Sequence, residues 1–261
     1  MGKGDKTKDA VALVIKNFLA CTDAKDVREV NDGHVRQYWQ YEINHSPTKS
    51  RRTAHNRTTF LLAFLKAHGV VIKWKIPPFD QTLPEVYEPE ESEALLAACD
   101  AKHRAAYSVM YKALFRDREV VYLTWDCVDV KRNILRVRSK PEYNWRVKKY
   151  RERDVTVPKD LIDQITALPR TSKLVLPRED GNPDGHLLRA LKDTAKKAGV
   201  DPKRAKLHSW RRSGATHLLQ KGLPLQEVMA LGGWKDLKSV QRYAGLLSHE
   251  RRQKAVEAAW A

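Results

Sequence analysis

Two consecutive prolines, Pro77 and Pro78, set the main division of this 261-residue chain. Proline cannot donate a helical hydrogen bond and biases the residue before it toward extended backbone, so no helix should pass through residues 75–80. Before this break, apolar residues recur at helical spacing in three stretches, Lys8–Cys21, Asp32–Ile43 and Pro47–Val71. We therefore expect a small helical domain at residues 1–76, a linker at 77–86 and a second domain at 87–261.

The second domain mixes helical and strand patterns. Five carboxylates at residues 85–93 lead into a helical stretch at Ala94–Leu114, and acidic residues stabilise the start of a helix through its dipole. After Trp125, short β-branched runs predict a small antiparallel sheet: Val128, Val130, Ile134, Leu135, Val137, Val155 and Val157. Helical patterns return at Lys159–Ala167, Leu187–Ala198, Ser213–Lys221, Leu225–Leu231 and Leu237–Tyr243, with a last helix around Glu250–Trp260. The expected fold class is mainly α with a small antiparallel β-sheet (α+β).

The composition indicates a polyanionic partner. Lysine and arginine number 49 against 32 aspartates and glutamates, which gives a formal net charge of +17.

The sequence does not favour a membrane protein. No apolar run approaches the roughly 20 residues needed to cross a bilayer, and Lys16 stops the apolar stretch Val11–Ile15, so we expect a cytoplasmic protein without a membrane partner. Cys21, Cys99 and Cys127 lie far apart and outside any CxxC pair, so we expect reduced thiols and no metal site. A glycine-rich phosphate loop is also missing from the sequence, so nucleotide hydrolysis has no support.

Residues 131–153 form the densest positive segment. They contain ten bases and only two acids, Glu142 and Glu152, with Tyr143, Trp145 and Tyr150 interleaved. Cationic side chains give a salt-sensitive attraction to nucleic acid that does not depend on base sequence. The segment therefore predicts a hairpin that follows a phosphate backbone, with a solvated basic loop as the alternative.

The C-terminal third carries sharper motifs. His208 and Arg211 are three residues apart, so on a helix they point the same way. An arginine fork can hold two non-bridging phosphate oxygens and stays charged, which suits a five-coordinate phosphorus. Leu231, Gly232, Gly233 and Trp234 follow, and Tyr243 comes nine residues after that tryptophan.

These motifs together resemble the C-terminal signature of the tyrosine recombinases (phage integrases). Upstream, Arg116, Glu119 and the Leu123-Thr124-Trp125 segment resemble the first conserved box of the same family. The resemblance covers about residues 85–250 as the catalytic domain. The helical segment before it resembles the family's DNA core-binding domain in size and pattern.

The resemblance implies that Tyr243 attacks a DNA phosphodiester to form a 3′-phosphotyrosyl bond, which needs no cofactor. Arg116 and Arg211 would clamp the scissile phosphate, and His208 and Trp234 would add hydrogen bonds. Glu119 would orient this cluster. Most relatives carry histidine at the position of Trp234, whose indole can donate a hydrogen bond but cannot transfer a proton.

The family also uses a lysine general acid on the turn between the second and third strands. Lys140 directly follows the expected strand Ile134–Arg138 and is the first choice. Counting back from Arg153 nominates Lys148 or Lys149 instead, because this hairpin is longer than usual.

The resemblance implies a site-specific DNA recombinase that serves as the integrase of a mobile element. The substrate would be double-stranded DNA and not a small molecule. The protein would be cytoplasmic and associated with the nucleoid. Its two domains would enclose the duplex, and a homotetramer would assemble on paired sites. The tail, Leu246–Trp260, would pack on a neighbouring subunit or on its own domain. A catalytically silent DNA-binding regulator and a type IB topoisomerase-like enzyme remain the alternatives.

Overall fold

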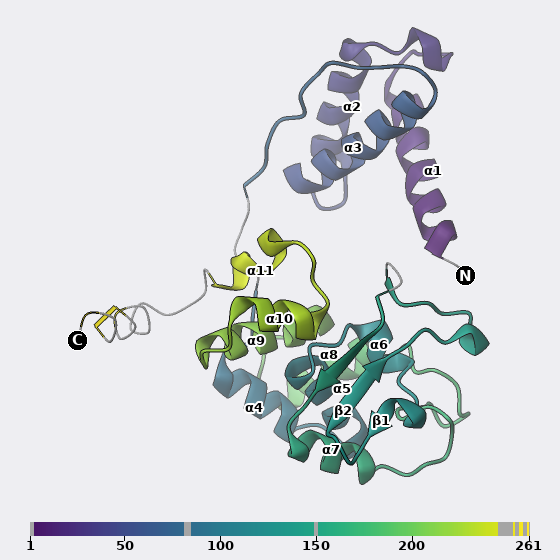
Figure 1. Cartoon of the computed structure of the whole chain (residues 1–261). Helices are drawn as coiled ribbons and strands as arrows, with labels where there is room; N and C mark the ends of the chain where they lie inside the picture. Colours follow the sequence, from purple (N-terminus) through teal and green to yellow (C-terminus); the bar gives the residue numbers. More distant parts are fainter. Residues whose placement is uncertain are drawn as a thin grey trace. The chain divides into compact units, whose positions relative to one another are not determined.

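The computed structural model describes residues 3–80, 85–148 and 151–244, together with residues 253, 256, 257 and 260. The chain divides into two compact units, Met1–Thr82 and Leu83–Ala261 (Figure 1). The boundary between them falls inside residues 77–86. Most of the expected tail, Leu246–Trp260 with its last helix, lies outside the described residues.

The first unit contains α1 (Lys3–Cys21), the short 3₁₀ helix η1 (Val27–Glu29), α2 (Asp32–His45) and α3 (Arg51–Ala67). The side chain of Asn31 caps α2 by accepting from the backbone N–H groups of Gly33 and His34. The three helices bury a common core: Val14, Phe18, Val35, Tyr38, Leu61 and Leu65. The three predicted helices are therefore confirmed, although α3 begins four residues after the predicted start at Pro47.

A buried carboxylate ties this unit together. Glu42 is fully buried and accepts hydrogen bonds from Arg57 Nη1 at 2.6 Å, Tyr38 Oη at 2.8 Å and Asn17 Nδ2 at 3.0 Å. A buried charge is costly unless it is paired and hydrogen-bonded, and here α1, α2 and α3 each supply one donor. The network therefore fixes the packing of the three helices.

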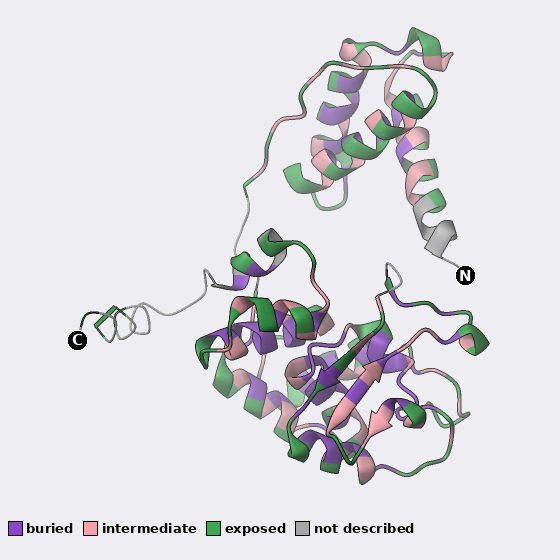
Figure 2. Cartoon of the chain, in the orientation of Figure 1, coloured by how far each residue is buried: buried purple, intermediate pink, exposed green. Residues whose placement is uncertain are grey.

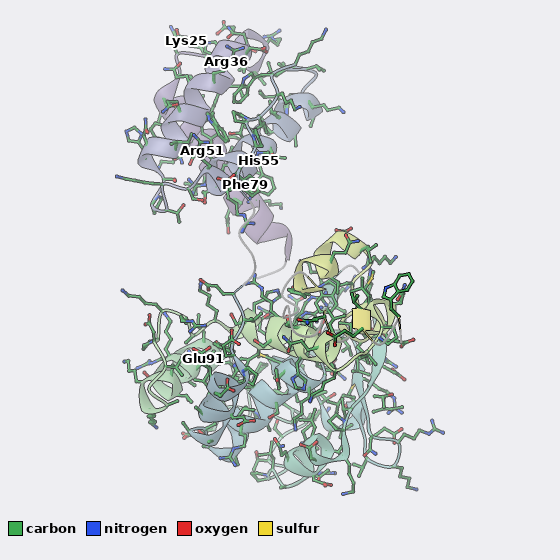
Figure 3. All side chains as sticks on the ribbon, turned by 90° about the vertical axis from the view of Figure 1, so that its left-hand side faces the viewer. Lys25, Arg36, Arg51, His55, Phe79 and Glu91 are labelled. Atoms are coloured by element: carbon green, nitrogen blue, oxygen red, sulfur yellow. The ribbon has the colours of Figure 1, made fainter. Side chains whose placement is uncertain are left out.

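The chain after α3 stays attached to it as far as Phe79. The ring of Phe79 lies edge-on to His55 at 5.1 Å, and the guanidinium of Arg52 lies 5.2 Å from the same ring. Figure 3 shows His55 and Phe79 together in the first unit. Helix α3 ends at Ala67, where Gly69 has φ 82°, and so stops before it reaches Pro77 and Pro78. The first part of the expected linker packs on α3.

The second unit contains α4 (Pro89–Ala97), α5 (Ala101–Lys112), α6 (Asp117–Val121), η2 (Trp125–Cys127), η3 (Pro141–Tyr143), α7 (Lys159–Thr166), α8 (Leu187–Lys197), α9 (Leu207–Gln220), α10 (Leu225–Gly232) and α11 (Leu237–Ala244). The expected single helix at Ala94–Leu114 is wrong, because the chain forms α4 and α5 with a break between them. Asp100 causes the break: its side chain accepts from the N–H of His103 and caps α5.

Helix α9 begins six residues before the predicted start at Ser213, so His208 and Arg211 lie on this helix.

The predicted antiparallel sheet is confirmed and has three strands, β1 (Val128–Asp129), β2 (Ile134–Val137) and β3 (Arg153–Thr156), in the order β1-β2-β3. Leu135 pairs with Val128 on one side and with Val155 on the other. Leu135 and Val155 are fully buried, so one face of the sheet joins the core of the unit.

Helix α9 is the central helix of this core and is buried along most of its length (Figure 2). Trp210 is fully buried and stacks on Tyr107 of α5, with ring centroids 5.7 Å apart and planes 7° apart. At Gly214 a side chain would overlap the carbonyl group of Tyr111, so glycine allows the backbone of α9 to approach α5. This close packing fixes the position of Arg211, three residues before Gly214.

Part of the connection between β2 and β3 is packed rather than solvated. Lys140 and Trp145 form an isolated antiparallel bridge, and the buried Trp145 stacks on Tyr122 at 4.9 Å. The basic segment is therefore anchored on the helical part of the unit at this point, while Arg146 and Lys148 are exposed.

None of the described helices is long and apolar enough to span a membrane. Cys21, Cys99 and Cys127 are free thiols.

Candidate active site

Arg116 and Glu119 are joined by the start of α6. Arg116 is the N-cap, and its backbone N–H donates to Glu119 Oε2 at 2.9 Å. Its Nη1 donates to Glu119 Oε1 at 2.6 Å. At the spacing of three residues noted in the sequence, Glu119 thus accepts from both the backbone and the side chain of Arg116 and fixes that side chain.

Arg153, at the start of β3, contacts the same carboxylate. Its Nη1 and Nη2 lie 3.1 Å and 2.8 Å from the two oxygens of Glu119. Burial alone would raise the pKa of Glu119, but hydrogen bonds and charge from Arg153, together with Arg116, lower it to about 2. Glu119 is therefore ionised throughout the neutral pH range.

Arg211 is almost completely buried, with 1% of its surface exposed. Its Nη1 donates to the carbonyl of Leu114, and its Nη2 donates to the carbonyl of Gly232 at 2.5 Å. Its Nε has no partner within the described part of the chain. Burial and the charge of Arg116 lower the pKa of Arg211, although a guanidinium still keeps its proton at neutral pH.

The Leu231–Trp234 segment ends α10 and places an indole beside Arg211. Gly233 has φ 63°, and the N–H of Trp234 donates back to the carbonyl of Met229 at 2.9 Å. A side chain at Gly232 would overlap the Trp234 ring. Both glycines are therefore required for the turn, which brings the indole ring to 4.0 Å from the Arg211 guanidinium carbon.

Tyr243, on α11, completes this side of the cluster. Its ring centroid lies 5.8 Å from that of Trp234, and 6% of the residue is exposed. It belongs to a small apolar cluster with Leu114, Val228 and Val240. It is also close enough to Arg211 to affect the pKa of that guanidinium.

His208 lies one turn before Arg211 on α9 and is exposed at the surface. Desolvation by nearby protein atoms and the positive charges of Arg212 and Arg211 lower its pKa below the usual value. The imidazole is therefore neutral at pH 7 and has one donor and one acceptor nitrogen.

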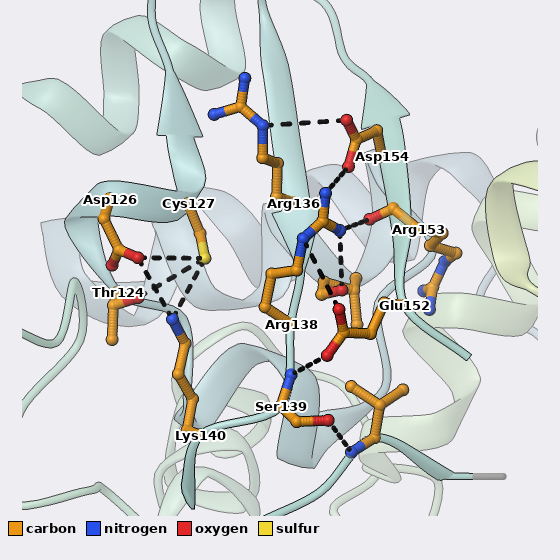
Figure 4. Close-up of polar contacts among 12 residues, drawn as sticks. Thr124, Asp126, Cys127, Arg136, Arg138, Ser139, Lys140, Glu152, Arg153 and Asp154 are labelled. Atoms are coloured by element: carbon orange, nitrogen blue, oxygen red, sulfur yellow. Dashed lines mark hydrogen bonds and ion pairs between the residues drawn. The ribbon is translucent and has the colours of Figure 1, made fainter. Parts of the chain in front are cut away.

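Lys140 is held in a different environment (Figure 4). Its amine points toward η2, 3.3 Å from Cys127 Sγ and 3.5 Å from Asp126 Oδ2, and the residue is 6% exposed. Burial alone would lower the pKa of Lys140, but Cys127 and Asp126 together raise it. None of its described contacts reaches Arg116, Glu119 or Arg211.

The structure thus brings together five of the seven residues selected from sequence: Arg116, Glu119, Arg211, Trp234 and Tyr243. His208 lies near enough to Arg211 and Arg116 for their charges to lower its pKa, and Lys140 is apart from the group. From sequence, Arg153 was one base among ten and the reference point for counting back to Lys148 and Lys149, with no place in the site. Its alternation with Val155 would have found it, since residues two apart on a strand share a face and Val155 is buried.

The described residues include no group of three or more histidines, cysteines, aspartates or glutamates that could hold a metal ion. The polar cluster around Arg211 consists of cations, one carboxylate, an indole and a phenol. Such a set favours an anionic ligand with several oxygens.

Comparison with known proteins agrees with this geometry. Residues 85–250, more than half of the chain, match the phage integrase family. The tyrosine recombinase XerD of Pseudomonas putida is 28% identical over 78% of this chain and 73% of its own length. The tyrosine recombinase XerA of Thermococcus kodakarensis is 28% identical over 87% of this chain and 86% of its own length.

Solved structures show the same fold. The Tn1549 transposon integrase, in complex with transposon right-end DNA, has a TM-score of 0.75 at 15% identity and covers 98% of this chain and 94% of its own. The XerH site-specific recombinase, bound to a difH substrate, has a TM-score of 0.71 at 17% identity and covers 96% of this chain and 78% of its own. The chain therefore belongs to the phage integrase family, whose members are tyrosine recombinases, as the sequence motifs predicted.

Proposed function

We propose that this protein is a site-specific DNA recombinase that cleaves and rejoins duplex DNA through a 3′-phosphotyrosyl bond to Tyr243. One observation carries the proposal. Arg116, Glu119, Arg211, Trp234 and Tyr243 come from α6, α9, α11 and the end of α10, yet they meet around one buried guanidinium. A packed core without catalytic use would have little reason to gather several cations beside a phenol.

The chemistry follows from the donors that remain free. Each arginine has five N–H donors, and the described contacts use one side-chain donor of Arg116 and two of Arg211. The remaining donors can bind the non-bridging oxygens of a phosphate as charge develops on them. Tyr243 Oη then attacks phosphorus and loses its proton to water, while the bond from phosphorus to the 5′ oxygen breaks and that oxygen takes a proton from the general acid.

The phosphotyrosyl bond keeps the energy of the phosphodiester. A free 5′ hydroxyl can therefore attack it and restore the DNA backbone without ATP. The neutral His208 and the indole of Trp234 are further hydrogen-bonding groups for the phosphate or the nucleophile.

The departing 5′ oxygen needs a proton, and we assign its donor to Lys148 rather than to Lys140. The amine of Lys140 is buried against Cys127 and Asp126, which raise its pKa and make it a poorer acid. Lys148 is exposed on the same hairpin. Lys149, the other candidate, lies outside the described residues and is tested beside it.

A nicked suicide substrate tests the nucleophile, because it traps the covalent adduct on a denaturing gel. The wild type should form the adduct, and Tyr243→Phe should bind DNA but form none. An adduct in Tyr243→Phe would eliminate the assignment. DNA binding without any adduct in the wild type would favour the silent regulator.

A 5′-phosphorothiolate substrate tests the acid, because its sulfur leaves without a proton. Lys148→Ala should lose cleavage of normal DNA and regain it on this substrate, whereas Lys140→Ala should cleave both. Rescue of Lys140→Ala alone would restore the first choice made from sequence, and rescue of Lys149→Ala alone would move the role by one residue.

The partners follow from the same proposal. We assign to the helical first unit the binding of duplex DNA beside the cleavage site. We expect strand exchange to take place at the nucleoid in a homotetramer that holds two paired DNA sites. An integrase role for a mobile element is supported by the similarity to the Tn1549 transposon integrase. Sedimentation with one and with two DNA sites tests the tetramer, and a monomer that relaxes supercoiled DNA would favour the topoisomerase alternative.

A further inference from the structure

Arg153 makes all of its described side-chain contacts inside the protein. Nη1 and Nη2 bind the two oxygens of Glu119, and Nε donates to the carbonyl of Leu231 at 2.8 Å. Its guanidinium carbon lies 5.4 Å from the ring of Phe115, and 9% of its side chain is exposed. Arg153 therefore uses N–H donors on all three of its side-chain nitrogens for bonds within the protein.

These contacts join three parts of the site. Glu119 belongs to α6 and holds Arg116, while Leu231 belongs to the turn that carries Trp234. Arg153 itself begins β3, next to the basic hairpin. The carbonyl of Arg153 accepts from Nη1 of Arg138 at 3.1 Å, which ties the two strands at this end of the sheet (Figure 4).

Neighbouring carbonyls at the end of α10 are held by two different arginines. Leu231 accepts from Arg153, and Gly232 accepts from Arg211. Without Arg153, the α10 turn would be held on one side only. Glu119 would then keep Arg116 as its one described arginine partner and draw that guanidinium inward.

We infer that Arg153 is a positioning residue for DNA cleavage: it neutralises Glu119 and anchors the Leu231–Trp234 turn, so that Arg116 and Trp234 stay in place for the scissile phosphate. This inference rests on the proposed function. It assigns no contact between Arg153 and DNA. It explains why a base from the DNA-binding hairpin segment is buried among catalytic side chains.

Single-turnover cleavage of the suicide substrate at saturating DNA measures the effect. Arg153→Gln should slow adduct formation by about 10²-fold, the scale of loss for a misplaced reacting group. Its affinity for intact DNA should change little. Arg204→Gln is the matched control, because Arg204 also pairs with a glutamate, Glu91, in the same unit but outside the site.

A charge-balancing variant separates positioning from simple loss of stability. In Arg153→Gln, the charge of Glu119 is balanced by Arg116 alone, so its pKa should rise, and protonation at acidic pH should release Arg116 and restore part of the cleavage rate. Adding Glu119→Gln removes the titrating charge, so the double variant should cleave faster than Arg153→Gln at neutral pH and show no such recovery at acidic pH. Arg153→Lys keeps the charge and should recover part of the rate.

The outcomes are distinguishable. If wild type forms no adduct, the proposed function fails, and the role of Arg153 with it. If wild type cleaves and folded Arg153→Gln cleaves equally fast at saturating DNA, only the inference fails. A lower melting temperature with an unchanged pH profile and full activity at reduced temperature would make Arg153 merely structural, which also overturns it.

Discussion

At the scale of single residues, the site depends on where side chains are absent as much as on where they are present. Gly232 leaves space for the indole of Trp234, which in turn lies against Arg211 and near Tyr243. The glycine two residues before Trp234 therefore has a steric explanation.

Gly232→Ala should displace the Trp234 ring, because the new methyl group would overlap it. We expect a loss of about 1–3 kcal/mol in the free energy of unfolding, typical of overpacking, and a larger fractional loss of cleavage. Urea unfolding and single-turnover cleavage measure the two effects. Gly185→Ala is the control, since nothing lies within 4 Å of its added methyl group, and equal behaviour of both variants would contradict the steric role.

The lowered pKa of His208 gives a pH dependence with a definite sign. The unfolded chain takes up this proton near pH 6.5, whereas the folded protein resists it. The free energy of unfolding is therefore unaffected by this titration above about pH 6.5, and it decreases as the pH falls below that value, because the unfolded chain binds the proton more tightly. The melting temperature of wild type should therefore fall relative to that of His208→Asn as the pH drops below about 6.5, and a difference that does not change with pH would show that the folded-state pKa is not lowered.

At the scale of elements, much of the fold follows from local sequence. Apolar spacing predicts the helices of the first unit and α7, α8, α10 and α11, and the β-branched runs predict the sheet. The break between α4 and α5 was missed because Ala98–Asp100 continues a helical pattern, and only the bond from His103 to Asp100 shows the cap.

Chemistry and spacing selected Arg116, Glu119 and Arg211 from the sequence, and the structure brings these side chains together, while their catalytic roles stay predictions. The direction of the Lys140 side chain was beyond such reasoning. Its position after β2 suggests a general acid, but its amine packs against η2, and the sequence does not show which way the side chain turns. Arg153 was missed for another reason, because its position on the same strand face as the buried Val155 was not considered.

Asp100→Ala should lower the free energy of unfolding by about 0.5–2 kcal/mol, because α5 loses its N-cap acceptor. Asp100→Asn should recover most of this loss, since an asparagine oxygen can accept the same bond. Urea unfolding gives both values. Cleavage by folded protein should be unchanged, and a cleavage defect in Asp100→Ala with normal stability would contradict a purely local role.

At the scale of the whole molecule, the two units have separate cores. The described buried apolar clusters each lie within one unit: Leu61 belongs to the first unit, and Leu161 to the second. Each unit therefore has the means to unfold as a cooperative body.

Calorimetry of paired core variants tests this separation. Leu61→Ala should lower only the transition of the first unit, and Leu161→Ala only that of the second, each by about 2–5 kcal/mol because a cavity is left. Both side chains are almost fully buried, which makes them matched controls for each other. One transition that shifts equally in both variants would mean that the units unfold as one.

The carbonyl anchors of Arg211 have a practical consequence. The guanidinium already joins the end of α5, through Leu114, to the end of α10, through Gly232, so its orientation is set during folding and little rearrangement is left for the moment when DNA arrives. Because of the same anchors, a loss of activity in Arg211→Ala would have two causes. The substitution removes donors for the phosphate, and it also removes the bonds that hold two helix ends. A stalled DNA complex for structural work is better prepared with Tyr243→Phe, which takes away one oxygen atom and leaves these two anchors intact.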